Sequence, residues 1–176
     1  MPTLPAVPYN FTPGTTIYSA QVDADFTAIQ TTALAILGDV TGGNATAGQI
    51  GEYISSDASY PGGAITSTVS ANITSISLTA GDWDVEGIVG LAPAAGTTTS
   101  QLRGWVSSTS VKANPNELDG LINSGAAVPA AQISGGPTGA VRFALATTTT
   151  VYLSVNATFA VSTMQAFGFI RARRVR

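Results

Sequence analysis

The 176-residue sequence contains no cysteine and no histidine, and only 10% of its residues are charged. Without cysteine there is no disulfide framework and no thiolate metal site. Without histidine the chain lacks the usual general base, the usual partner in a catalytic triad and the commonest transition-metal ligand. The sequence therefore predicts a protein that is not an enzyme and that binds neither a cofactor nor a metal.

The scarcity of charge also bears on association. A formal net charge of −3 argues against general nucleic-acid binding. A monomer with so few charged residues would be poorly soluble unless part of its surface were covered. We therefore expect the chain to associate with copies of itself.

Signals for export and membrane insertion are missing as well. The opening MPTLPAVPYNF has neither the positive region nor the apolar region of a signal peptide. No run reaches the roughly 18 apolar residues that a membrane span needs. The expectation is a soluble chain that begins at or next to Met1 and has no membrane partner.

The convincing helix is Ser19–Gly38, within a segment 17–38. Ser19 can cap its start, Asp23 and Asp25 suit the positive end of the helix dipole, and Gly38 suits its end. The helix would be supported either by symmetry mates in a short parallel bundle or by the chain's own β domain, because little more than two heptads are present. Apolar residues recur every four and three positions, which is the spacing of a seam between helices, at Val22, Phe26, Ile29, Ala33 and Ile36.

Residues 1–16 hold four prolines, which keep a backbone extended and deny it regular hydrogen bonds. Such a segment can be a disordered tail. Alternatively it is an attachment arm, because apolar side chains that are costly to leave in water lie between the prolines, namely Leu4, Val7, Tyr9 and Phe11. Residues 39–50 have the glycine-rich composition of a linker.

From residue 51 onward the sequence predicts strands bounded by turns, which indicates an antiparallel β-sandwich, with a jelly roll as the natural eight-strand version. The turn at 79–82 is expected to join two strands as a hairpin. Residues 108–139 are expected to form a long loop region, either functional or a mobile insertion. The expected strands are Glu52–Ser55, Ala64–Val69, Ala71–Leu78, Trp83–Val89, Gln101–Ser107, Ala140–Ala146, Thr149–Phe159 and Met164–Ala172.

One expected strand has a clear acidic face. Trp83, Val85 and Gly87 alternate with carboxylates, so one side is buried and the other charged. Carboxylates about 6.6 Å apart along a strand could flank a substrate or share a Ca²⁺ ion, but no loop motif accompanies them. A solvated or ion-paired face is the favoured reading, and its residues are Asp82, Asp84 and Glu86.

Four of the seven basic residues lie in the last seven positions, Ile170–Arg176. A basic tail can bind nucleic acid, and an arginine-rich strand can equally pair with an acidic neighbour. Arg171 and Arg173 share one strand face, so we expect them to form an ionic face with the three carboxylates, within a protomer or across an interface.

Four segments together resemble bacteriophage fibre and fibre-like virion proteins. FTPGTTIYSAQVDADFTAI (Phe11–Ile29) is similar to an extended arm that passes into a short trimeric helix. Similarity to a C-terminal β-sandwich domain is carried by ITSISLTAGDWDVEGIV (Ile73–Val89), SQLRGWVSSTS (Ser100–Ser110) and FAVSTMQAFGFIRARRVR (Phe159–Arg176).

The resemblance implies a homotrimer with its arms anchored to other virion proteins of the capsid, portal or tail. Its helices would join along the three-fold axis, and residues 51–176 would form a β knob. The implied function is a short fibre or spike that attaches to a host-surface glycan or protein, assembled in the host cytoplasm and located in the virion. Family fibres carry shaft repeats that this sequence lacks, so capsid decoration that stabilises the shell is the alternative.

Overall fold

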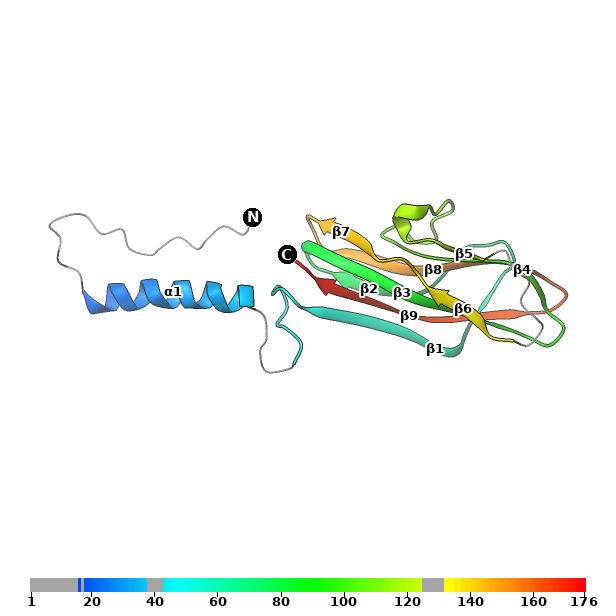
Figure 1. The fold of residues 1–176 in the computed structure, drawn as a ribbon, viewed down its shortest axis with the longest axis horizontal. Helices are drawn as coiled ribbons and strands as arrows, with labels where there is room; N and C mark the ends of the chain where they lie inside the picture. Colours follow the sequence, from blue (N-terminus) through cyan, green and yellow to red (C-terminus); the bar gives the residue numbers. More distant parts are fainter. Residues whose placement is uncertain (1–15, 17, 38–42, 125–131) are drawn as a thin grey trace. The chain divides into compact units, whose positions relative to one another are not determined.

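The computed structural model describes residues 16, 18–37, 43–124 and 132–176, with the side chains of 31–37 left out (Figure 1). The chain divides into two compact units, Met1–Glu52 and Tyr53–Arg176. The first unit contains a helix and the second contains the strands. The predicted arm residues Leu4, Val7, Tyr9 and Phe11 lie outside the described residues, as does Gly38.

Helix α1 spans Ser19–Leu37. Ser19 is its first residue and not its cap, because the chain already turns at Tyr18, whose backbone N–H donates to the Gln21 side chain at 3.1 Å. This is half of a capping box, in which the third helical residue satisfies a free N–H before the helix. Asp23 and Asp25 consequently lie beyond the first turn, which contains no acidic residue.

The second unit is a β-sandwich of two antiparallel sheets, so the predicted mainly-β sandwich class is confirmed. One sheet has five strands in the order β1-β9-β3-β6, with β7 also paired to β3, and the other has the order β2-β8-β4-β5 (Figure 1). The elements of this unit are β1 (Tyr53–Ile65), β2 (Ala71–Leu78), β3 (Gly81–Pro93), β4 (Thr98–Ser107), η1 (Glu117–Asp119), β5 (Ile122–Ser124), β6 (Ser134–Pro137), β7 (Val141–Leu145), β8 (Thr149–Ala160) and β9 (Met164–Arg174).

The core lies between the two sheets and follows the two-residue period of their strands. Trp83, Val85 and Val89 on β3 are fully buried, as the alternation predicted, and so is Leu153 on β8. Gly87 belongs to the same inward row, and a Cβ there would lie 2.5 Å from Leu153 Cδ1. The missing side chain at position 87 therefore lets the leucine reach the middle of the opposite sheet.

The expected hairpin across residues 79–82 is wrong. β2 pairs with β8 in one sheet, whereas β3 pairs with β9 in the other. Both strands bury apolar side chains, including Leu78 on β2 and Trp83 on β3, and these face the same core. The turn therefore crosses from one sheet to the other, because burial on both sides of the core outweighs pairing between neighbours in sequence.

Strand β1 is one long strand where two short ones were expected. The register against β9 shifts between Ala58 and Gly63, so a bulge carries the strand past the Pro-Gly-Gly segment. Gly62 has a φ of +83°, and a Cβ there would lie 1.8 Å from the carbonyl oxygen of Ala166. Glycine is the residue that permits this conformation and this close approach.

The region 108–139 contains ordered elements, η1, β5 and β6, where a long loop was expected. β6 and β7 both pair with β3, and Thr138 bridges the gap between them. Its backbone N–H donates to the Gly87 carbonyl at 2.8 Å, and its hydroxyl accepts from the Gly87 N–H at 2.9 Å. A threonine side chain thus replaces the ladder hydrogen bond that the break removes. Residues 125–131 are not described.

We expect Leu153→Ala to lower the free energy of unfolding by about 2 to 5 kcal/mol, because it removes fully buried methyl groups and leaves a cavity. Leu118→Ala is the matched control, since the Leu118 side chain is 82% exposed and should change stability by less than about 0.5 kcal/mol. Urea unfolding of the full chain measures both. Equal losses in the two variants would contradict the assignment of the core.

Candidate interaction face

The residues of interest lie on the side of the five-stranded sheet that points away from the core, which we call the outer face. Directly opposed residues in paired strands lie on the same side of a sheet, so the registers identify its members. Glu86 of β3 opposes Arg171 of β9, and Ile88 opposes Phe169. Tyr53 of β1 opposes Arg173, at the end of the sheet where β1 begins. Along the strands the outer face changes from charged to apolar.

The charged half brings together the predicted ionic residues, with one partner that sequence reasoning missed. Arg171 Nη2 lies 2.5 Å from Glu86 Oε1. Asp84 opposes Arg173 in register, yet its ion pair is with Arg142 of β7, Nε to Oδ1 at 2.6 Å. Arg142 lies on β7 directly opposite Asp84, so its place beside β3 depends on the pairing of these two strands.

Asp82, at the end of the acidic row, pairs with Arg176 at 2.7 Å, Oδ2 to Nη2. The backbone holds the same contact, because the Asp82 N–H donates to the Arg176 carbonyl and the Val175 N–H donates to the Asp82 carbonyl. Each predicted carboxylate of β3 therefore contacts a guanidinium. Such an arrangement fixes the register of strands and leaves these carboxylates already engaged as acceptors.

These contacts also favour the charged form of two arginines. The hydrogen bond to Glu86, and then the attraction of its charge, raises the pKa of Arg171 above its ordinary value. The hydrogen bond to Asp84 raises the pKa of Arg142 in the same way. A raised pKa means that any stability contributed by the cation is fully present below the ordinary arginine pKa and is lost only as the pH rises above it. Both arginines therefore stay charged throughout the neutral range.

A hollow of about 460 Å³ lies over the charged half. Its walls combine paired charges with small apolar side chains. The residues that line it are Tyr53, Asp84, Glu86, Ala140, Arg171, Ala172, Arg173 and Val175. Among the described residues no group of three or more acidic, histidine or cysteine side chains is placed to hold a metal ion.

The apolar half continues along the same strands. Phe167 of β9 opposes Gly90 of β3, and the Phe167 ring packs directly over the glycine. A Cβ at position 90 would lie only 2.2 Å from Cζ of that ring. Tyr60 of β1 packs edge-on against Phe167, with ring centroids 5.4 Å apart and an interplanar angle of 85°. Shallow hollows lined by Ile88, Phe169 and Phe167 follow one another across this half. Sequence reasoning missed this half, although Ile88 follows the predicted inward row of Trp83, Val85 and Gly87 and so belongs to the opposite face.

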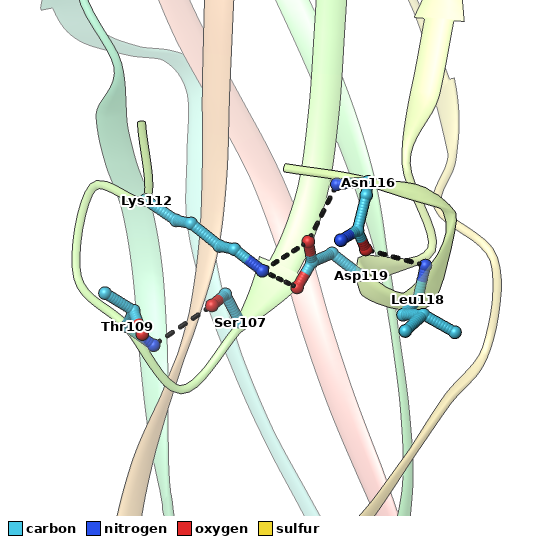
Figure 2. A network of polar contacts seen from close by, with 6 residues as sticks. All are labelled: Ser107, Thr109, Lys112, Asn116, Leu118 and Asp119. Carbon is cyan, nitrogen blue, oxygen red and sulfur yellow. Dashed lines mark hydrogen bonds and ion pairs between the residues drawn. The ribbon is translucent and has the colours of Figure 1, made fainter. Parts of the chain in front are cut away.

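Region 108–139, which the sequence predicts to be a loop that is either functional or a mobile insertion, contains a polar network of its own (Figure 2). Lys112 Nζ contacts both carboxylate oxygens of Asp119, at 2.8 and 2.7 Å. The Asn116 N–H donates to Asp119 at 2.9 Å, and the Leu118 N–H donates to the Asn116 side chain at 3.0 Å (Figure 2). Asn116 and Asp119 thus form a capping box around η1. The pattern Asn-x-x-Asp followed by Gly120 was the sequence signal for it.

This network holds the loop against the four-stranded sheet. η1 contacts β4, and Ser107 at the end of that strand accepts a hydrogen bond from the Thr109 N–H at 3.0 Å (Figure 2). Trp105 on β4 is fully buried although it is not a member of the core between the sheets, since it alternates with the inward-facing Val106. The network therefore has a structural role, which is to hold η1 beside β4.

No protein-family model and no curated protein matches this sequence. Similar solved structures come from infectious bursal disease virus. The VP2 subviral particle has a TM-score of 0.45 and 10% identity over 70% of this chain and 32% of that chain. The structure of the Gx strain has a TM-score of 0.42 and 11% identity over 69% of this chain and 31% of that chain. The structure of the T13 viral particle has a TM-score of 0.41 and 8% identity over 70% of this chain and 35% of that chain. The chain spans about a third of the length of these structures.

The predicted trimer seam lies on helix α1 of the first unit, and the predicted attachment residues Leu4, Val7, Tyr9 and Phe11 lie outside the described residues. The two seam residues Phe26 and Ile29 are exposed on α1, and Val22 is partly buried. The side chains of Ala33 and Ile36 are not described. No helix in the described part of the chain has the length and apolar character of a membrane span.

We expect Asp119→Ala to lower the free energy of unfolding by about 1 to 3 kcal/mol, because Lys112 and the Asn116 N–H lose a partly buried acceptor. Amide hydrogen exchange over 112–120 should become faster. Glu117→Ala is the control, because it removes an exposed carboxylate from the same turn. Comparable exchange in both variants would show that the network does not hold the loop.

Proposed function

We propose that this chain is a non-enzymatic structural protein of a bacteriophage particle. Three copies form a short fibre or spike, residues 1–16 attach it to other virion proteins, and a jelly-roll-like knob faces the host surface. The sequence resemblance of the arm, helix and sandwich segments supports this proposal. Many copies per particle would turn weak contacts with a host glycan or protein into firm attachment.

The observation that carries the proposal is the exposed apolar face of α1. Phe26 is 60% exposed and Ile29 is 55% exposed, and a spacing of three places them on one side of the helix. Burying each would stabilise an assembly by about 1.5 to 3 kcal/mol. We propose that two further copies of the helix bury these side chains, because the spacing of the two residues is that of a seam between helices.

The helix itself needs such support. Its 19 residues make a rod of about 28 Å, and isolated helices of this length are marginal in water. The Thr27 hydroxyl donates a hydrogen bond to the Asp23 carbonyl at 2.8 Å, and a local bond of this kind does not strengthen a helix. Packing along the seam would supply what local propensity does not.

The alternative within the same class is capsid decoration, in which the trimer reinforces the shell and the knob has no ligand. It is favoured by the sequence itself, which contains no shaft repeats to carry a receptor-binding tip away from the particle. Both functions require the arm and the trimer, so they differ only in what the knob contacts.

We expect Ile29→Lys to convert the trimer to a single chain, because it would place a charged side chain in the apolar seam, where burial of the charge is costly. Light scattering of the full chain should fall from three times 17.8 kDa to 17.8 kDa. Thr27→Lys is a closely matched control. The lysine at 27 follows Asp23 by four residues, just as the lysine at 29 follows Asp25, so both variants add the same helix-supporting ion pair. A monomeric wild-type chain, or a trimeric Ile29→Lys variant, would contradict the seam.

Deleting residues 1–16 should release the protein from phage particles while the soluble protein stays trimeric, because the arm and the seam are separate segments. Sedimentation of particles that carry the wild-type or the deleted protein measures the release. Retention of the deleted protein on particles would exclude the arm as the anchor.

A separate comparison distinguishes the two functions. Binding of the purified trimer to host cells would favour the fibre, and loss of heat resistance in particles that lack the protein would favour decoration.

A further inference from the structure

The outer face carries apolar side chains that a free sheet surface would not normally expose. Tyr60 is 61% exposed and Ile88 is 54% exposed, and Ile133, beside β6, is 53% exposed. Among the described residues of the sandwich, the other exposed large apolar side chains lie outside the strands, at Val69, Val111, Leu118 and Val161. Exposed large apolar side chains on the described strands are thus confined to this one face, and such a patch marks a contact surface.

The charges of the same face are balanced. Four carboxylates, Asp57, Asp82, Asp84 and Glu86, share it with Arg142, Arg171, Arg173 and Arg176. Three of the carboxylates already contact an arginine of their own chain. The face therefore presents both signs in equal number and has no net field to attract a partner of one charge.

We propose that the outer face packs against the sandwich of a second copy of this chain. The apolar half, around Tyr60, Ile88 and Phe167, forms the dry centre of the contact, and the paired charges form its rim. This inference rests on the proposed trimer, because the joined helices hold the sandwiches at a high effective concentration, at which a modest patch is sufficient.

A copy of the same chain fits this surface better than a foreign partner does. A surface with equal numbers of both charges can meet an identical chain without leaving one sign in excess, whereas a foreign charged partner would be neither attracted nor oriented by it. The apolar half offers aliphatic and aromatic side chains, with the Phe167 ring packed against Gly90 and edge-on against Tyr60, which is the composition of an interface centre. The low charge of the whole chain is also explained if its apolar sheet surface is covered.

The absence of cysteine provides a background-free test. Ile88→Cys places a thiol on the outer face, and Val161→Cys places one at a turn position that is 85% exposed. Each is made in the wild-type chain and in the Ile29→Lys background, and its rate of reaction with a maleimide is measured alongside the mass by light scattering. We expect the thiol at 88 to react at least about tenfold more slowly in the trimer than in the single chain, and the thiol at 161 to react equally in both.

The outcomes separate the two proposals. A trimer whose thiol at 88 reacts as fast as in the single chain overturns the packing of the outer face and leaves the seam intact. A wild-type chain that is monomeric overturns both. Protection at 88 that persists in an oligomeric Ile29→Lys variant supports the face and contradicts the seam. A thiol at 88 that is free in the purified trimer and protected only on particles assigns the face to another virion protein and overturns the inference.

Discussion

The pairing of β3 with β9 is the interaction on which the rest of the sandwich depends. The two strands run opposite one another without a break from Trp83 and Arg174 to Pro93 and Met164. Each strand sends one row of side chains into the core and the other row to the outer face, because successive residues of a strand point to opposite sides. One register therefore sets both the packing of the core and the composition of the outer surface.

At one end of this pairing the inward row is closed by a specific contact. Arg174 is buried over the ring of Trp83, 4.3 Å from its centroid, and its guanidinium donates to the Ala80 carbonyl. A buried arginine needs such partners, because an unpaired charge in the core would be costly. Gly87 in the middle of β3 gives space to Leu153 of the opposite sheet. The residues of β3 are thus matched in size and chemistry to the side chains of β8 and β9 that pack against them.

On the outward side the same register sorts the surface into two halves. Glu86 meets Arg171 at one step, and Ile88 meets Phe169 at the next. Exposed ion pairs of this kind contribute little to stability and more to orientation. The apolar half has the greater energetic weight, since burial of its side chains against another surface would remove them from water. A chain with so few charges has placed nearly half of them on this face, and six of these eight residues form three ion pairs.

The sequence alone determined which residues of β3 lie inside and which outside, and that Arg171 and Arg173 share one face of β9, because these choices are local and follow the two-residue period of a strand. It also determined the mainly-β sandwich class and the position of the helix. Only the tertiary structure decided which strands pair, as β2 and β3 show by joining different sheets. Pairing depends on contacts between residues far apart in the chain, such as Arg142 with Asp84. The apolar half of the outer face, assembled from β1, β3 and β9, is invisible in any one segment for the same reason.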